Sequence, residues 1–240
     1  MTNPTAAMLV IGDEILSGRT RDANMHHLAR ELTRHGITLA EVRIVPDDAS
    51  AIETATRALS DSYDYVFTSG GIGPTHDDIT AECVARAFDT PIDVRDDARA
   101  LLQAHYDRQG QELNAARLRM ARIPEGAALI DNPVSIAPGF TLKNVHVMAG
   151  VPAVFQTMVA SVLPTLTGGE PLLSRTLRIN RGEGDIAGPL ADLAEQYDDL
   201  SIGSYPYVHN GVFGVNIVIR GPEGARVDAA TQTLAKLFPE

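Results

Sequence analysis

The residue types best suited to chemistry occur in one short run, Ser69-Gly70-Gly71-Ile72-Gly73-Pro74-Thr75-His76-Asp77-Asp78. Its three glycines lack the Cβ atoms that would keep a ligand away from the main chain. Main-chain N–H groups at a turn between a strand and a helix bind anions, phosphate above all. We therefore expect this run, called the glycine loop below, to hold the phosphate of a small-molecule ligand through Ser69, Gly70, Gly71, Gly73, Pro74 and Thr75.

Two carboxylates, Asp77 and Asp78, close the glycine loop. A phosphate site that ends in acidic side chains usually takes a divalent cation between the acid and the phosphate. Asp78 is accordingly the first candidate for a catalytic residue and for a metal ligand. The alternative is an ordinary turn in which Asp78 caps the helix that follows, because aspartate suits that position. The two roles are compatible.

The strands that must position these groups are predicted by apolar runs at residues 6–11, 37–45 and 63–68, with helical patterns between them. Strands that alternate with helices predict a parallel sheet with right-handed crossovers. Ligands bind such sheets at the carboxyl ends of the strands. Here those ends carry Gly12-Asp13-Glu14, Pro46-Asp47-Asp48 and the glycine loop. The sequence therefore predicts three groups of acids at one edge of the sheet.

These acids have distinct expected roles at a phosphate site, where a divalent cation neutralises phosphate charge and a carboxylate can orient or deprotonate a water. Asp47 is expected to act with Asp78 as a catalytic residue on the metal–phosphate unit. Asp13 or Glu14 would hold the metal or the water, and Gly12 would lie close to the ligand. As alternatives, Asp47 caps the next helix, and Asp13 and Glu14 form an exposed loop pair.

Three residues outside the glycine loop complete the expected binding site: Asn24, Gly139 and Gly150. Asn24 either contacts the ligand or helps to start its helix. The two glycines either border the ligand or only form turns. The pattern leaves both pairs of alternatives open.

Capping and periodicity predict where the first two helices begin and which side chains they bury. The first follows Asp22, ends at Gly36 and has an apolar face of Met25, Leu28, Ala29 and Leu32. The second begins with a capping-box pattern at Ser50 and Glu53. Its predicted inner face consists of Ile52, Ala55, Thr56 and Leu59.

Beyond residue 91 the pattern predicts helices at 96–109 and 112–122, a hairpin turning at Lys143-Asn144, and a helix at 153–163. A linker at 164–174 leads to a β-α-β-β-α arrangement whose hairpin turns at Asn210-Gly211. We therefore expect an α/β domain at 1–168 and a small α+β domain at 169–240.

Composition excludes several classes of protein. The net charge is −11, from 31 acidic and 20 basic residues, which argues against nucleic acid as a partner. The single cysteine, Cys83, excludes an internal disulfide and a cysteine-based zinc site. No apolar run approaches the roughly 18 residues of a membrane span, and the N-terminal apolar run is too short for a signal peptide. We expect a cytoplasmic protein that binds no membrane.

The motifs as a set resemble a known family. The glycine loop, Gly12-Asp13-Glu14-Ile15-Leu16 and Asp22-Ala23-Asn24 are together similar to the molybdopterin-binding (MoCF) domain family. More narrowly, the chain resembles the N-terminal part of the competence/damage-inducible protein A (CinA-like) family, and the same domain type is attached to some eukaryotic FAD synthases. The resemblance extends over nearly the whole chain, through Ala137-Pro138-Gly139-Phe140, Gly150-Val151-Pro152 and Gly203-Ser204-Tyr205-Pro206.

The resemblance implies a three-layer α/β/α sandwich with a mainly parallel sheet. It implies a pterin phosphate or a nucleotide diphosphate as ligand, with Asp78 and Asp47 at the positions of the acids that matter in MoCF transferases. CinA-like relatives imply hydrolysis of ADP-ribose-like or FAD-like pyrophosphates that depends on a divalent metal (Mg or Co) and on potassium. The resemblance also implies a homo-oligomer, a dimer or a trimer. It implies no deamidase activity, since the deamidase domain is not among these 240 residues.

Three departures from the family pattern concern the pterin or base pocket more than the phosphate loop. They are Ala149, Ser135-Ile136 and the alanine of Asp22-Ala23-Asn24. Two alternative functions therefore stand beside hydrolysis. One is molybdopterin binding and adenylylation, in which molybdopterin is the ligand. The other is nucleotide binding without catalysis.

Overall fold

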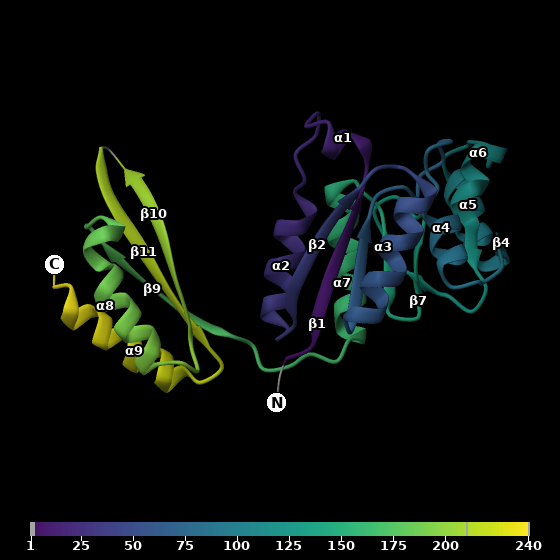
Figure 1. Cartoon of the computed structure of the whole chain (residues 1–240). Coiled ribbons are helices and arrows are strands. Elements are labelled where there is room, and N and C mark those ends of the chain that lie inside the picture. Colours follow the sequence, from purple (N-terminus) through teal and green to yellow (C-terminus); the bar gives the residue numbers. More distant parts are fainter. Residues whose placement is uncertain (1–2, 210, 240) are drawn as a thin grey trace. The chain divides into compact units, whose positions relative to one another are not determined.

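The computed structural model describes residues 3–209 and 211–239 and divides the chain into two compact units, Met1–Gly169 and Glu170–Glu240. Figure 1 shows the strands and helices of each. The first unit contains β1 (Thr5–Ile11), α1 (Asp13–Leu16), α2 (Asn24–Arg34), β2 (Thr38–Val45), α3 (Ala49–Ser62), β3 (Tyr65–Ser69), α4 (Thr80–Ala87), β4 (Ile92–Val94), α5 (Asp96–Arg108), α6 (Ala115–Leu118), η1 (Arg119–Ala121), β5 (Arg122–Pro124), β6 (Ala128–Ile130), β7 (Gly139–Leu142), β8 (Val145–Met148), α7 (Pro152–Val162) and η2 (Leu163–Thr165).

The central sheet of the first unit has six strands in the order β2-β1-β3-β8-β7-β6. Neighbouring strands from β2 to β8 are parallel, and β7 pairs antiparallel with β8 and β6. The mainly parallel sheet predicted from the sequence is therefore confirmed. Because β1, β2, β3 and β8 run in the same direction, the residues that follow them emerge at one edge of the sheet. A small separate ladder joins β4 to β5.

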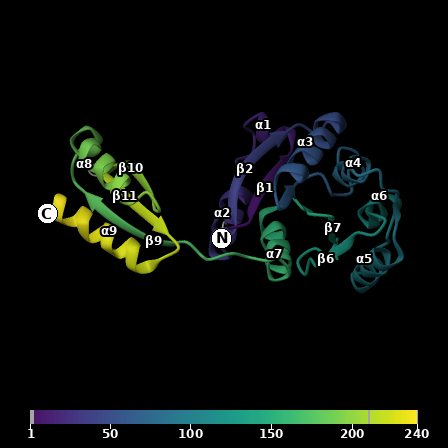
Figure 2. The same ribbon diagram turned by 60° about the horizontal axis from the view of Figure 1, so that its bottom comes forward.

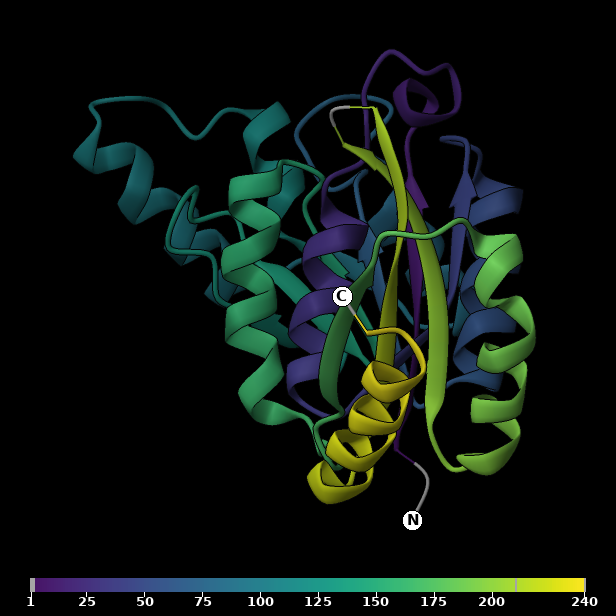
Figure 3. The ribbon, with the colours of Figure 1, turned by 90° about the vertical axis from the view of Figure 1, so that its left-hand side faces the viewer.

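Helices cover both faces of this sheet. In β1, Ala7, Leu9 and Ile11 pack in one core with α3, α4 and α5, while Met8 and Val10 pack in a second core with α2 and α7. Figure 2 shows α4 and α7 on opposite sides of the sheet, and Figure 3 shows α2 beside α7. The three-layer α/β/α sandwich is confirmed, and the fully buried β1 explains its continuous apolar sequence.

Helix α2 matches the predicted pattern with one exception. Leu28 and Leu32 are fully buried, and Gly36 follows the helix with a φ of 67°. Met25, predicted to lie on the buried face, is 40% exposed, so this part of the prediction was wrong. In the first turn the buried position is occupied by Asn24, whose side chain bonds to Ser69 and Gly150, and the next residue, Met25, faces outward.

Helix α3 begins at a different cap from the one predicted. The side chain of Asp48 accepts a hydrogen bond of 2.9 Å from the N–H of Ala51, so Asp48 is the N-cap and the Ser50–Glu53 capping box was wrong. Asp47 does not cap the helix. The buried residues of α3 are the predicted ones: Ile52, Ala55, Thr56 and Leu59.

Residues 112–122 do not form the single helix that was predicted. They contain the four-residue α6, one turn of 3-10 helix and the first residue of β5. Arg122 pairs with Val94 in the β4–β5 ladder, which stops the helix. The hairpin of β7 and β8 forms as predicted, with Lys143 at a φ of 54°.

The second unit contains β9 (Leu173–Ile179), α8 (Glu183–Gln196), β10 (Ser201–His209), β11 (Val212–Gly221) and α9 (Gly224–Leu237). Its antiparallel sheet has the order β10-β11-β9, and both helices pack with its strands in one core (Figure 1). The β-α-β-β-α order is therefore confirmed. Asn210, predicted in the hairpin turn, lies outside the described residues.

Within residues 3–209 and 211–239, no helix combines the length and apolar character that crossing a membrane requires.

Candidate functional site

A cavity of about 720 Å³ lies at the edge of the sheet where the parallel strands end. This volume is in the range of pockets that bind nucleotides and other ligands of that size. Residues from the ends of β1, β2, β3 and β8 contribute to its wall. Of the residues predicted for the site, those that line the cavity are Gly12, Glu14, Asp47, Gly70, Gly71, Gly73, Pro74, Asp78 and Gly150.

The glycine loop is folded so tightly that side chains would not fit at its glycines. A Cβ on Gly70 would lie 2.2 Å from the carbonyl oxygen of Ile11, and one on Gly71 would lie 2.1 Å from Oγ1 of Thr80. Both glycines also have positive φ values, 109° and 69°. The glycines therefore serve the packing of the loop. The N–H of Gly70, predicted to bind phosphate, donates instead to the carbonyl of Met148 at 3.2 Å.

Thr80 fastens the other end of this loop. Its N–H donates to the carbonyl of Gly71 at 2.9 Å, and its hydroxyl donates to the carbonyl of Gly70 at 3.0 Å. Both carbonyls are thereby engaged at the start of α4. The loop is a fixed element of the cavity wall.

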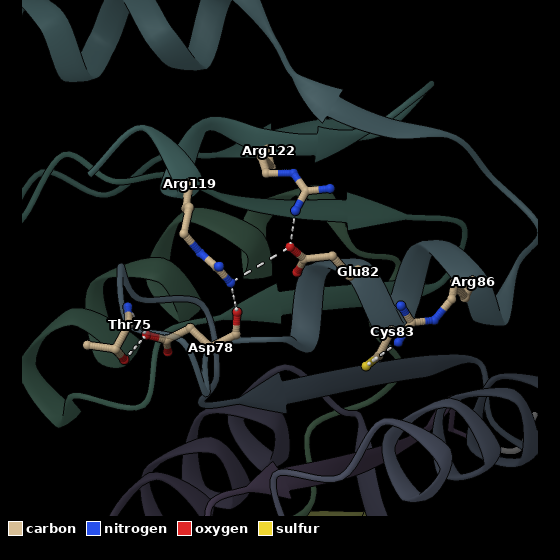
Figure 4. Close-up of polar contacts among 7 residues, drawn as sticks. All are labelled: Thr75, Asp78, Glu82, Cys83, Arg86, Arg119 and Arg122. Atoms are coloured by element: carbon tan, nitrogen blue, oxygen red, sulfur yellow. Dashed lines mark hydrogen bonds and ion pairs between the residues drawn. The ribbon is translucent and has the colours of Figure 1, made fainter. Parts of the chain in front are cut away.

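Asp78 belongs to the glycine loop and does not cap α4. Its Oδ2 accepts hydrogen bonds from the N–H of Thr75 at 2.8 Å and from the Thr75 hydroxyl at 2.5 Å (Figure 4). The N-cap position of α4 is Ile79, which has no side-chain cap. Thr75 thus holds the Asp78 carboxylate at the cavity, but Thr75 itself is not among the residues of the cavity wall.

Two arginines that were not predicted stand behind this loop. Nη2 of Arg119 donates to the main-chain carbonyl of Asp78 at 3.1 Å and lies 4.0 Å from the Glu82 carboxylate. Arg122 pairs with the same carboxylate (Figure 4). One acid between two arginines leaves a net positive charge beside a loop that is expected to bind phosphate. No sequence signal linked these arginines to the loop, because about 40 residues separate them.

Asp47 lies among other acids at the ends of β1 and β2. Its Oδ2 accepts a hydrogen bond of 3.0 Å from the N–H of Asp13. The pKa of Asp47 is raised, first because burial disfavours the charged form, and further because the carboxylates of Asp13, Glu14 and Asp77 repel it. The Asp13 side chain is exposed, and Asp13 is not among the residues of the cavity wall.

Asn24 and Ser69 line a smaller hollow that adjoins the main cavity. This side hollow has a volume of about 60 Å³ and shares Glu14 and Gly150 with the main cavity. Nδ2 of Asn24 donates to Oγ of Ser69 at 2.8 Å and to the carbonyl of Gly150 at 2.7 Å. Asn24 therefore joins the start of α2 to the ends of β3 and β8.

Gly139 has a packing role in the structure. It lies in β7, and a Cβ there would come within 2.3 Å of the carbonyl oxygen of Val147 in the neighbouring strand. It lines neither the main cavity nor the side hollow. The prediction that Gly139 borders the ligand therefore finds no support in its position.

The acidic side chains of the main cavity are suited to bind a cation together with the phosphate of a ligand, not by themselves. Among residues 3–209 and 211–239, no three histidine, cysteine or acidic side chains are grouped as a metal site. Magnesium, however, is commonly bound by one or two carboxylates together with substrate phosphates. Asp78 and Asp47, which line the cavity that contains the glycine loop, fit that arrangement. Burial is the main cause of the raised Asp47 pKa, and a cation would relieve the repulsion among the carboxylates that adds to it.

Comparison with known families divides the chain in the same way as the structure. A family described as a probable molybdopterin binding domain matches residues 7–168, and the middle domain of FAD synthase matches residues 171–240.

Two curated relatives carry informative names. The chain is 33% identical to a probable FAD synthase from Caenorhabditis elegans, over 98% of this chain and 50% of that protein. It is 41% identical to a CinA-like protein from Citrifermentans bemidjiense, over 68% of this chain and 40% of that protein. The chain thus spans about half the length of the FAD synthase relative and matches less than half of the CinA-like one.

A solved structure gives the same relationship. The protein CinA from Thermoplasma acidophilum, described as having unknown function, is 33% identical to this chain with a TM-score of 0.63. The match covers 69% of this chain and 99% of that one. The chain therefore belongs to the molybdopterin-binding domain family, and CinA-like proteins and proteins named FAD synthase are among its relatives.

Proposed function

We propose that the first unit binds a nucleotide with its diphosphate against the glycine loop and hydrolyses the pyrophosphate linkage with the help of a divalent cation. The observation that carries this proposal is the convergence of Asp47, Asp78 and the glycine loop on one cavity of about 720 Å³. These groups come from the ends of two different strands. Their combination of N–H donors and carboxylates is what pyrophosphate chemistry requires.

The substrate class is a dinucleotide or nucleotide sugar of the FAD or ADP-ribose type. The name FAD synthase, given to a relative that matches 98% of this chain, supports a ligand of this class. In the reaction, water adds to one phosphorus, and the bond from that phosphorus to the bridging oxygen breaks. The products are AMP and a second phosphate ester, FMN or ribose 5-phosphate.

Each group has a defined part in this reaction. Gly71 and Gly73 would present main-chain N–H groups to the phosphate oxygens. The N–H of Gly70 donates to the carbonyl of Met148 and is not available. Asp78 and Asp47 would hold a divalent cation, which supplies charge neutralisation on the phosphates when bound. Asp47 would also orient the attacking water, because a carboxylate beside the metal–phosphate unit can accept a hydrogen bond from it.

The test measures the AMP that purified protein releases from ADP-ribose and from FAD. Each substrate is tested with Mg²⁺ or Co²⁺ and with or without K⁺. Asp78→Asn is expected to abolish the release, because the carboxylate is lost while the side-chain shape is kept. Full turnover by Asp78→Asn, or no AMP release under any of these conditions, contradicts the proposed reaction.

A second candidate function is molybdopterin binding with adenylylation. The match of residues 7–168 to a probable molybdopterin binding domain favours it. It predicts tight binding of the pterin and transfer of AMP from ATP without hydrolysis of dinucleotides. Binding of nucleotides without turnover of any of these substrates would instead indicate a domain that binds but does not catalyse.

A further inference from the structure

The amide oxygen of Asn24 is buried and has no hydrogen-bond donor among the described residues. The side chain as a whole is 3% exposed. Its orientation is determined by its neighbours, because Nδ2 lies 2.7 Å from the carbonyl of Gly150 and a carbonyl can only accept. If the Asn24 amide were flipped, Oδ1 would lie against the carbonyl oxygen of Gly150, and the two acceptors would repel each other. Oδ1 is therefore a free acceptor in a site where free acceptors are unfavourable.

Asn24 is not needed to start its helix. The carboxylate of Asp22 accepts a hydrogen bond of 2.9 Å from the N–H of Met25, which satisfies a donor of the first turn. Of the two roles that the sequence left open for Asn24, helix initiation is thus filled by another residue. Its Nδ2 instead fastens Ser69 and Gly150, and its Oδ1 remains available.

The side hollow beside Asn24 has walls suited to a small polar group on an apolar ring. Val10, Ile11 and Ile15 belong to its apolar wall. Glu14, Asp22 and Asn24 carry acceptor oxygens, and Arg21 also lines the hollow. A volume of about 60 Å³ corresponds to roughly four or five water molecules at ~10–15 Å³ each. Such a hollow is too small for a purine or a flavin ring and large enough for the hydroxyl-bearing edge of a sugar.

The hollow opens next to the place proposed for the diphosphate. It shares Ile11, Glu14, Thr20, Gly150 and Pro152 with the main cavity. In a nucleotide, the group attached to the phosphates is ribose, and its two hydroxyls are hydrogen-bond donors. Acceptor oxygens beside an apolar wall match such a diol, and a carboxylate binds ribose hydroxyls in other nucleotide sites.

We propose that the side hollow is a ribose subsite in which Oδ1 of Asn24 accepts a hydrogen bond from a ribose hydroxyl, with Glu14 as the second acceptor. This proposal rests on the proposed function, since it takes the diphosphate to lie against the glycine loop. It makes Asn24 a residue that determines specificity for ribonucleotides over their deoxy analogues. A site that leaves a buried acceptor unpaired rejects the analogue that lacks the donor.

The test compares ADP, 2′-deoxy-ADP and 3′-deoxy-ADP as ligands, with Mg²⁺ present, by titration calorimetry on the full chain. The wild-type protein is expected to bind ADP about tenfold more tightly than at least one deoxy analogue. Asn24→Ala is expected to bind the three nucleotides with equal affinity. The matched control is Asn132→Ala, because Asn132 is equally buried and its amide atoms all have partners within its own loop. Asn132→Ala should change the affinities for ADP and for its two deoxy analogues by the same factor, so that their ratios stay unchanged.

The outcomes separate this subsite from the proposed function. If ADP binds but both deoxy analogues bind equally well, the subsite is wrong while diphosphate binding stands. If ADP does not bind at all, both proposals fall. A preference that survives in Asn24→Ala overturns the role of this residue. Should that variant not fold, a crystal structure of the wild-type ADP complex decides, because a water on Oδ1 with the ribose elsewhere refutes the subsite.

Discussion

The main-chain N–H of Asp13 donates a hydrogen bond of 3.0 Å to Oδ2 of Asp47, although 34 residues separate them. This bond joins the end of β1 to the end of β2 and limits the rotation of the Asp47 carboxylate. Since Asp47 also lines the main cavity, the same contact that stabilises the sheet edge orients a proposed catalytic group.

Asp47→Asn is expected to lower AMP release about 100-fold or more, because the amide oxygen can still accept from Asp13 but cannot hold the cation or orient the water as a carboxylate does. The matched control is Asp48→Asn, which changes the neighbouring residue. Asn is as good a helix cap as Asp, so this variant should keep full activity. Steady-state kinetics with ADP-ribose and FAD measure both. Equal losses in the two variants would show that Asp47 has no special role.

The same variant tests the raised pKa of Asp47. Folding raises this pKa, so the protonated form stabilises the folded state at low pH, and that contribution is lost as pH rises through the folded-state pKa. At pH 7 the ionised carboxylate therefore costs stability. Urea unfolding should show Asp47→Asn to be at least as stable as the wild type at pH 7. A clear loss of stability would contradict the raised pKa.

Arg119→Gln is expected to lower kcat about tenfold with little change in the free energy of unfolding, because Arg119 holds the carbonyl of Asp78 from a partly exposed position. Arg117→Gln serves as the control. That arginine bonds to Glu112 and Gln111 and lies over the ring of Tyr106, and these partners are outside the glycine loop. Kinetics and urea unfolding on both variants give the comparison. Unchanged kcat in Arg119→Gln would mean that the loop needs no support from this side.

Gly71→Ala is expected to destabilise the protein by more than about 2 kcal/mol and to weaken nucleotide binding. The added Cβ would meet Thr80 Oγ1 at 2.1 Å, in addition to the cost of a positive φ. Gly110→Ala measures the cost of the positive φ alone, because Gly110 has a φ of 64° and open space around it. That control should cost only about 1–2 kcal/mol. Thermal and urea unfolding measure both, and equal losses would exclude the predicted clash.

Acidification should destabilise the protein through His146. Burial lowers the pKa of this side chain from 6.5 to about 4. Between these values the unfolded chain binds a proton that the folded chain excludes, so the free energy of unfolding falls as pH falls. The full effect is roughly 3 kcal/mol. His146→Leu should unfold with a weaker pH dependence between pH 6.5 and 4.5, and a slope equal to that of the wild type would contradict this account.

Cys83 should be unreactive in the folded protein. It is fully buried in α4, and burial raises its pKa to about 11. Because the thiolate is the reactive form, Ellman's reagent at pH 8 should label the thiol only as the protein unfolds. Labelling in urea is the positive control. Rapid labelling without denaturant would show that α4 opens readily.

The parts of the fold that depend on local pattern were predictable. The apolar run that forms β1 and the inner face of α3 were identified correctly. A strand buried on both faces has a continuous apolar sequence, and a helix buried on one face has a periodic one. The choice between Asp48 and Ser50 as helix cap was wrong, since both residue types cap well and only the path of the chain after β2 decides.

The parts of the site that depend on tertiary contacts were not predictable. Asn24 was a candidate by type, but its partners Ser69 and Gly150 are 45 and 126 residues away. Arg119 was missed because its contact with Asp78 spans 41 residues and follows from the break in the predicted helix. The predicted parallel topology implied that the carboxyl ends of the strands would lie close together. The topology did not indicate which side chains would bond to the residues at these strand ends.

The pairing of β8 between β3 and β7 has a consequence for synthesis on the ribosome. Residues 1–69 supply β1, β2 and β3, but the outer edge of β3 finds its partner only when residues 145–148 have emerged. Until then β3 presents unpaired N–H and C=O groups, a surface prone to association with other chains. The nascent chain must therefore keep an incomplete sheet from aggregating while about 75 further residues are translated.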